Sequence, residues 1–300
     1  MSAVHGILLV DKPEGMTSAA VVRTVKKALG VEKVGHLGTL DPFASGLLPI
    51  CFGEGTKIAQ FLMSERKAYS GTIRLGIETD TYDGTGTVTR TDAVPVITPT
   101  TLQGLIQRFS GEYWQTPPMY SALKHRGTPL YKLARRGIEI EREQRKVVID
   151  DFSLETIEDS LLRFSLVCSK GTYVRTLAAD VGAALGGCGA HLATLRRTGF
   201  GPFVVESAVS LSRCTELFEQ GTLPVLSLTA ALQHYQAVAL TSEEVKLVRQ
   251  GQQGVLRQVL PATAEESEPT QLLGPSGELV AMVQHRDGQW QFLRVFSALQ

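Results

Sequence analysis

Residues 34–52 read VGHLGTLDPFASGLLPICF, in which a polar, glycine-rich stretch runs directly into an apolar one. Three glycines and a proline within residues 34–46 disfavour helix and strand alike, so we predict a long loop there. The continuous apolar run at 47–52 predicts a buried strand. Long loops held against a core often carry function, and this one contains His36 and Asp41.

The segment before the loop predicts a strand, a turn and a helix. Residues 6–11, GILLVD, favour a short buried strand, and Pro13 marks the turn after it. Thr17 or Ser18 can then cap a helix whose apolar residues recur at helical spacing as far as Gly30, which is placed to end it.

Beyond residue 52 the predicted helices and strands mix irregularly. Helices are predicted at 56–63, 99–109, 130–136 and 172–185, and strands at 69–77, 86–91, 147–157 and 161–168. This order lacks the regular alternation that marks a doubly wound parallel sheet. We therefore predict an α+β fold built on a mostly antiparallel mixed sheet flanked by helices and loops.

The pattern changes at residues 221–224, GTLP, after which short strands follow. We predict these strands at 237–240, 254–259, 279–283 and 291–295, with a short helix that begins at a capping box formed by Thr241 and Glu244. A chain of 300 residues is long enough for about two domains. We therefore expect a larger domain at 1–230 and a small β-rich domain at 231–300.

Composition excludes several classes of protein. The chain has 43% hydrophobic and 20% charged residues, which is typical of globular proteins and unlike disordered or collagen-like chains. Its longest apolar stretches, such as 223–232, are shorter than the roughly 18 residues that a membrane-spanning helix needs. The apolar run at 6–10 is also too short for the core of a signal peptide. We expect no membrane association and a cytoplasmic location.

Cysteine spacing and short motifs exclude further functions. The four cysteines form no C-x-x-C pair and have no histidine at metal-ligand spacing, which predicts reduced, packed thiols and no metal site at Cys51, Cys168, Cys188 and Cys214. No nucleophile elbow, Walker loop or G-x-G-x-x-G motif occurs. The usual signatures of acyl transfer, NTP hydrolysis and dinucleotide binding are therefore missing.

Charge is balanced over the chain but concentrated locally. The 30 basic and 30 acidic residues cancel, yet eight basic residues outnumber three acidic ones between residues 124 and 146. Such a run is typical of a phosphate-binding surface, but an ordinary solvated surface produces it as well. A nucleic-acid function therefore needs independent support.

Two stretches carry candidate chemistry, the loop with Asp41 and CSKGTYVRTLAADVG at 168–182. A loop carboxylate can act as nucleophile or general base, although an Asp before a proline also simply starts a turn. His36 has an equally ordinary alternative as a surface or packing residue. At 168–182 a strand turns into a helix, where Lys170, Arg175 and free N–H groups can hold an anion. A buried Arg175 needs an acidic partner, and we predict Asp41, whose pKa the pair lowers.

Five stretches, in this order and spacing, resemble one family. They are GILLVDKPEGMTS (6–18), GHLGTLDPFASGLLPI (35–50), MYSALKHRGTPLYKLARRGIEI (119–140), CSKGTYVRTLAADVG (168–182) and LRRTGFGPF (195–203). The chain resembles the bacterial tRNA pseudouridine-55 synthases of the TruB type over residues 1–230. Residues 231–300 resemble the small PUA-like RNA-binding domain of that family more weakly.

The resemblance implies a pseudouridine synthase catalytic domain that isomerises the T-loop uridine at position 55 of tRNA. It implies no metal and no organic cofactor, because the reaction only breaks the N1–C1′ bond and joins C5 to C1′. It further implies the tRNA T-arm as partner, a monomer without an obligate protein partner, and extrusion of the target base from its stack.

Roles are assigned by resemblance at the matching positions. Asp41 matches the catalytic aspartate of the family, for which attack on C1′ and removal of the C2′ proton both stay open. Arg175 matches its ion-pair partner, and His36 matches the residue that fills the space left by the flipped base. The remaining pocket positions are Tyr69, which stacks on the base, Tyr173 and Leu195. The RNA backbone is expected at Lys124, Arg126, Lys132, Arg135, Arg136, Arg196 and Arg197.

Two other functions share these motifs. The chain could be an RNA-binding or RNA-folding module in which turnover is incidental, because base flipping by itself remodels tRNA. It could also be the catalytic subunit of a guide-dependent ribonucleoprotein. An inactive Asp41→Asn variant that still binds RNA argues against the first, and activity of the isolated chain on bare tRNA argues against the second.

Overall fold

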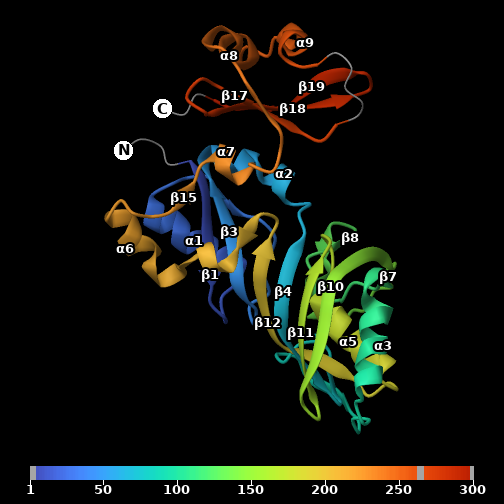
Figure 1. Ribbon diagram of the computed structural model, residues 1–300. Helices are drawn as coiled ribbons and strands as arrows, with labels where there is room; N and C mark the ends of the chain where they lie inside the picture. Colours follow the sequence, from blue (N-terminus) through green and yellow to red (C-terminus); the bar gives the residue numbers. More distant parts are fainter. Residues whose placement is uncertain (1–4, 262–266, 298–300) are drawn as a thin grey trace.

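The computed structural model describes residues 5–261 and 267–297 and contains two main sheets (Figure 1). A mixed sheet of 11 strands extends through the chain as far as Leu226, and a separate 4-stranded sheet follows it. Figure 1 shows the smaller sheet and its helices at one end of the large sheet. The predicted α+β architecture is confirmed.

The strands of the large sheet follow one continuous path. From one edge to the other they are β14 (Val209–Ser210), β1 (Gly6–Lys12), β3 (Ser45–Phe52), β12 (Ala190–Phe200), β4 (Lys67–Leu75), β11 (Leu161–Cys168), β10 (Arg145–Glu158) and β7 (Gly111–Gln115). Short strands attach to this path, namely β2 (Val34–His36) on β3, β13 (Phe203–Val204) on β12 and β15 (Val225–Leu226) on β1. Among the described strands of this sheet, only the β1–β14 and β3–β12 pairs are parallel, so the predicted antiparallel character is confirmed.

Helices and hairpins surround the large sheet. The helices are α1 (Ser18–Leu29), α2 (Ala59–Leu62), α3 (Pro99–Phe109), α4 (Leu130–Ala134), α5 (Val174–Ala184), α6 (Cys214–Glu219) and α7 (Leu228–Ala231), with 3-10 turns η1 (Gly53–Lys57), η2 (Val205–Ser207) and η3 (Leu211–Arg213). Two small hairpins pair β5 (Ile77–Thr79) with β6 (Val88–Thr91) and β8 (Lys124–His125) with β9 (Thr128–Pro129). The C-terminal part contains β16 (Ala237–Ala239), α8 (Ser242–Arg249), η4 (Gln253–Val255), α9 (Leu256–Val259), β17 (Thr270–Leu273), β18 (Leu279–Arg286) and β19 (Gln289–Val295).

The helix predicted before the loop is confirmed as α1. The side chain of Thr17 accepts a hydrogen bond of 3.1 Å from the N–H three residues later, and Gly30 ends the helix with a φ of 64°. The hydroxyl of Ser18 donates to the carbonyl of Leu40 at 3.0 Å and accepts from its N–H at 2.9 Å. The start of α1 therefore fixes the backbone of the residue just before Asp41.

Strands β12 and β7 were not predicted from the sequence. β12 pairs with β4 over almost its full length, and its side chains alternate between the two faces. Its inward position 197 is an arginine with no exposed surface, and β7 ends in the buried amide of Gln115. Polar residues at inward positions hide the alternation from which a strand is predicted.

Two further predictions need correction. Residues 254–259, predicted as a strand, are helical, because Val255, Leu256 and Leu260 pack at helical spacing into the C-terminal core. The predicted loop at 34–46 is irregular only in its centre, since its first residues form β2 and its last ones begin β3.

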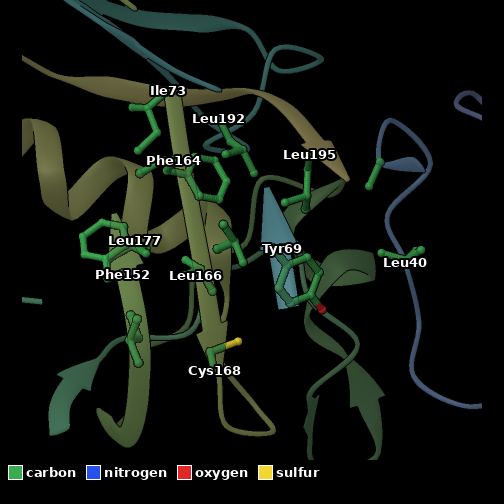
Figure 2. Packing of buried hydrophobic residues seen from close by; sticks show 14 of the residues in the cluster. Leu40, Tyr69, Ile73, Phe152, Phe164, Leu166, Cys168, Leu177, Leu192 and Leu195 are labelled. Atoms are coloured by element: carbon green, nitrogen blue, oxygen red, sulfur yellow. The ribbon is translucent and has the colours of Figure 1, made fainter. Parts of the chain in front are cut away.

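Buried apolar residues form three clusters, one against the large sheet, one that extends from the large sheet to the C-terminal part, and one within the C-terminal part. The first includes Phe164 and lies between the sheet and its helices (Figure 2). The second contains Ile7 and Leu9 of β1 together with Met282 and Phe296. A packed core therefore crosses the predicted domain boundary near residue 230.

Two compositional predictions can also be compared with the structure. All four cysteines are buried and free, which confirms the predicted reduced, packed thiols. None of the described helices is long and apolar enough to span a membrane.

Candidate active site

Asp41 lies in the irregular centre of the loop between β2 and β3, and the backbone around it is held from β1. Lys12, the last residue of β1, has no exposed surface. Its ammonium group donates to the carbonyl oxygens of Pro13, Met16 and Pro42 at 2.9, 2.7 and 3.3 Å. Burial lowers the pKa of Lys12 to about 8, although Asp41 opposes this shift. A buried cation thus ties the loop directly after Asp41.

Arg175, in the first turn of α5, binds the side chain of Asp41. Its Nε lies 2.9 Å from Oδ2 of Asp41, so the predicted pair forms. Nη1 donates to the carbonyl of Thr81 at 3.0 Å, and Nη2 donates to the carbonyl of Tyr120 at 2.8 Å. Only 6% of the Arg175 side chain is exposed, compared with 35% for Asp41. The guanidinium is therefore a fixed anchor, and the carboxylate remains accessible from outside.

A second carboxylate, Asp83, was missed by the sequence analysis. Its Oδ2 lies 3.6 Å from Nη1 of Arg175, and its side chain is 6% exposed. Its Oδ1 accepts hydrogen bonds from the hydroxyls of Thr81 and Thr85 at 2.9 and 2.6 Å and from the N–H of Thr85 at 3.0 Å. The sequence marked residues 82–84 only as a turn, and these local bonds are those of an ordinary Asp turn.

The pKa of Asp41 corrects one prediction. Burial raises this pKa above its ordinary value, and the negative charge of Asp83 adds to the effect. Arg175 lowers the pKa of Asp41, as predicted, and so does Lys12, but burial outweighs both. The carboxylate is consequently a stronger base than an exposed aspartate, and Arg175 limits how far the proton affinity rises.

Tyr69 and Leu195 lie on the neighbouring strands β4 and β12. They are 9% and 6% exposed and belong to the same core cluster as Leu40 of the loop. Figure 2 shows these three residues on one side of the cluster, away from Phe152 and Leu177. Burial raises the pKa of Tyr69, so its hydroxyl stays protonated at neutral pH. An aromatic ring and an aliphatic side chain thus meet beside the loop that carries the carboxylate.

Tyr173 and His36 complete the set of predicted pocket residues. Tyr173 is the N-cap residue of α5, two positions before Arg175, and is partly buried. His36 ends β2, and its Nδ1 is buried without a hydrogen-bond partner among the described residues. Burial lowers the pKa of His36, as does nearby Arg197, which favours the neutral imidazole.

The prediction that Arg197 contacts the RNA backbone is wrong, because its side chain faces inward from β12 and has no exposed surface. Its Nε donates to the carbonyl of Leu47 at 2.7 Å, and its Nη2 donates to the carbonyl of Gly38 at 3.1 Å. Arg197 therefore connects the two ends of the loop. A Cβ added at Gly46 would lie 2.3 Å from the backbone oxygen of Arg197, so the loop can approach β12 only with glycine there.

Comparison with known proteins places this arrangement in a family. The model of the TruB family pseudouridylate synthase N-terminal domain matches residues 26–174, and that of the tRNA pseudouridylate synthase B C-terminal domain matches residues 175–233. The chain belongs to the TruB family of pseudouridylate synthases. Asp41 and Asp83 lie within the residues that the N-terminal domain matches, and Arg175 is the first residue that the C-terminal domain matches.

TruB family relatives cover nearly the whole chain. A protein of Syntrophotalea carbinolica is 41% identical over 98% of this chain and 98% of its own length. A protein of Geobacter sulfurreducens is 46% identical over 83% of this chain and 82% of its own length. Both are named tRNA pseudouridine synthase B.

Solved structures share the fold as well. One is described as a crystal structure of a Cbf5-Nop10-Gar1 complex; the matching chain is 25% identical, has a TM-score of 0.73, and aligns over 98% of this chain and 85% of its own. Another, an archaeal box H/ACA sRNP Nop10-Cbf5 complex, matches with a TM-score of 0.72 at 23% identity over 98% of this chain and 86% of its own. The chain therefore shares its fold with these solved structures.

Several exposed basic residues of this TruB family member lie on the β8–β9 hairpin and around α4. Five of them form no ion pair among the described residues, namely Lys124, Arg126, Lys132, Arg135 and Arg136. Farther along the stretch, Arg142 pairs with Glu139 at 3.3 Å and Lys146 pairs with Glu112 at 2.7 Å, while Arg145 is exposed and has no ion pair among the described residues. Arg196 is 40% exposed but pairs with Asp11 at 2.8 Å.

The residues that the structure describes contain no group of three or more histidine, cysteine, aspartate or glutamate side chains with metal-binding geometry.

Proposed function

We propose that the chain isomerises the uridine at position 55 in the T-loop of tRNA to pseudouridine, with Asp41 as the catalytic group and without a cofactor. One observation carries the proposal: the carboxylate of Asp41 is partly exposed while its Oδ2 is held at 2.9 Å by the buried Arg175. Relatives named tRNA pseudouridine synthase B, at 41% and 46% identity, support the substrate class.

The chemistry needs little beyond this pair. In pseudouridine formation the N1–C1′ bond breaks, the uracil turns, C5 bonds to C1′, and the proton of C5 is lost while N1 gains one. Atoms and electrons balance within the nucleotide, so no oxidant, reductant or leaving group is required. A carboxylate that serves as nucleophile or base, next to a site that holds the base, is sufficient.

Two routes use the same ionised Asp41. In the first, a carboxylate oxygen attacks C1′ and displaces the uracil, as in covalent glycosyl chemistry. In the second, the carboxylate removes the proton from C2′ and the sugar passes through a glycal. Arg175 holds Oδ2 in either case, which leaves Oδ1 to face the sugar.

The side chains around the carboxylate suit an extruded base. We infer that Tyr69 stacks on the flipped uracil, with Leu195 and Tyr173 as walls, because these residues lie on elements adjoining the loop. Extrusion costs a few kcal/mol, which contacts of this kind offset. His36, neutral and partly buried, is placed at the end of β2 to fill the vacated position in the RNA stack.

RNA binding is assigned to the unpaired basic residues on the β8–β9 hairpin and α4, together with Arg196. Phosphate contacts supply most of the affinity for RNA and do not require a basic protein overall. The chain has 30 basic and 30 acidic residues, so RNA binding depends on where basic residues are concentrated and not on the net charge. We assign residues 1–230 to catalysis and 231–300 to a PUA-like RNA-binding domain, and expect a cytoplasmic monomer that needs no protein partner.

The decisive experiment measures tritium release from T-arm RNA labelled at C5 of uridine, because only formation of the C5–C1′ bond displaces that hydrogen. The Asp41→Asn variant is expected to lose on the order of a thousandfold or more in rate. Its affinity for T-arm RNA is expected to stay within about twofold, since phosphate contacts dominate binding.

Matched substrates separate the rival functions. Bare tRNA with uridine at position 55 is expected to react, and tRNA with cytidine there is expected to release no tritium from other uridines. Turnover by Asp41→Asn contradicts the assigned catalytic group. A chain that binds tRNA tightly without turnover is an RNA-folding module, and a chain that needs a guide RNA belongs to the ribonucleoprotein class.

A further inference from the structure

One buried amide joins the edge strand β7 to the start of α5. Gln115 is 1% exposed, and its Oε1 accepts a hydrogen bond of 2.8 Å from the N–H of Tyr173. Its Nε2 donates to the carbonyl of the same residue at 3.0 Å. A side chain that binds both backbone groups of one residue fixes the position and the rotation of that residue.

Among the described residues, no other side chain binds both backbone groups of a residue at the start of α5. Tyr173 is the N-cap residue, and its side chain makes no capping hydrogen bond. Gly171, two residues earlier, has a φ of 85°, so the approach to the helix is a tight turn. Arg175 follows Tyr173 by two residues, and a displacement of the helix start therefore displaces its guanidinium.

The second amide hydrogen of Gln115 extends the contact along α5. Nε2 also donates to the hydroxyl of Tyr113, and that hydroxyl donates to Oδ2 of Asp180 at 3.4 Å. Tyr113 and Gln115 are two positions apart on β7 and thus face the same side. Figure 1 shows β7 beside α3 and α5. Strand β7 therefore contacts α5 at its N-cap residue, Tyr173, and again at Asp180.

The cost of burying an amide makes this contact informative. A buried polar side chain stabilises a fold only when its hydrogen bonds are made, and an apolar residue fills the same space without that requirement. Among the described residues, every hydrogen bond of the Gln115 side chain is directed to Tyr173 or to Tyr113, which itself contacts α5. The amide is therefore suited to orientation more than to packing.

We propose that Gln115 is a positioning residue that fixes Arg175, and through it the orientation of Asp41. The inference rests on the proposed function, because it assigns Gln115 to the reaction at Asp41. Gln115 contacts the backbone of Tyr173 at the start of α5 and affects Asp41 only through Tyr173 and Arg175. The charged groups that act on Asp41 are Arg175, Asp83 and Lys12.

The test compares Gln115→Met, which keeps the volume and removes the hydrogen bonds, with the unaltered chain. The single-turnover rate of tritium release is expected to fall about ten- to a hundredfold, the effect of a small misplacement in an active site. The affinity for T-arm RNA is expected to stay within about twofold. Because Arg175 lowers the pKa of Asp41, a loosened pair also moves the acid limb of the rate profile to higher pH.

Three variants separate positioning from general stability. Tyr113→Phe removes the contact with Asp180 but leaves both bonds to Tyr173, so its pH profile is expected to shift less than that of Gln115→Met. Leu105→Ala makes a cavity under α3 and is expected to lower Tm without moving the profile. Gln115→Glu is expected to exceed Gln115→Met in rate as the pH falls, because the neutral acid can accept and donate as the amide does.

A turnover-independent measurement completes the test. The NMR titration of the Asp41 carboxyl carbon is expected to give a higher pKa in Gln115→Met than in the unaltered chain. Equal pKa values, or a rate loss that Leu105→Ala reproduces at equal Tm, overturn the proposal for Gln115. An unaltered chain without turnover refutes the proposed function instead, and the NMR comparison still decides the positioning role.

Discussion

Two buried arginines adjoin the loop that carries Asp41, and among the described residues only one of them is paired with carboxylates. Arg175 meets two carboxylates, Asp41 at 2.9 Å and Asp83 at 3.6 Å. Arg197 meets no carboxylate among the described residues and binds two backbone carbonyls, with its guanidinium 5.5 Å from the ring of Phe200. The same type of side chain thus orients the carboxylate of Asp41 in one place and holds the backbone of the Asp41 loop in the other.

The uncompensated arginine also changes its surroundings. Burial lowers the pKa of Lys67 to about 8, and the charge of Arg197 adds to that effect. Arg197 likewise contributes to the lowered pKa of Lys12 and of His36. The region behind the loop is therefore electropositive before any ligand arrives, which favours the approach of a polyanion.

The largest effect is expected at the compensated arginine. Arg175→Met leaves Asp41 and Asp83 without the guanidinium between them, so the pKa of Asp41 rises further and the rate at neutral pH is expected to fall on the order of a hundred- to a thousandfold. Tritium release measures the rate. Arg175→Lys keeps the charge but lacks the planar fork, and an intermediate rate is expected. A rate for Arg175→Met close to that of the unaltered chain refutes the anchoring role.

A smaller effect is expected at the uncompensated arginine. Arg197→Met leaves the carbonyls of Leu47 and Gly38 unpaired but also removes a desolvated charge, so the free energy of unfolding is expected to fall by about 2 kcal/mol. The rate is expected to fall about tenfold as the loop loosens. Arg196→Met, at the adjacent outward position, breaks a partly exposed pair and is expected to cost less than about 1 kcal/mol. Equal losses for the two variants contradict the distinction.

The smallest effect on the rate is expected when Asp83, the second carboxylate at Arg175, is neutralised. Asp83 raises the pKa of Asp41, so Asp83→Asn is expected to lower that pKa and to shift the acid limb of the rate profile to lower pH. The sign follows because activity requires ionised Asp41, and ionisation becomes easier when a neighbouring negative charge is removed. Asp80→Asn, at an exposed carboxylate nearby, serves as control. A shift to higher pH shows that Asp83 acts mainly by holding Arg175.

The two arginines also show how far sequence patterns reach. The strand and helix at 6–30 and the hairpin of β10 and β11 were predicted, because their apolar residues alternate or recur without interruption. The needs of a buried charge made Asp41 a candidate partner of Arg175, and the family resemblance predicted the pair. β12 was missed because Arg197 occupies an inward position, and for the same reason Arg197 was taken for an RNA contact.

Other parts of the site carry no signal in a single sequence. Asp83 has the surroundings of an ordinary turn, and Gln115 is one amide in a short polar strand. The proposed roles of both residues depend on partners far along the chain, since Gln115 binds Tyr173 and Asp83 approaches Arg175. Periodicity reports which face of an element is buried, but not which distant group meets it.

The core that joins β1 to the C-terminal part has a consequence for synthesis. Ile7 and Leu9 are synthesised long before Met282 and Phe296, yet the four residues belong to the same packed cluster. Contacts between residues so distant in sequence form late in folding. The cluster is therefore complete only after the C-terminal part has been synthesised, and until then the nascent chain exposes apolar side chains that can associate with other chains.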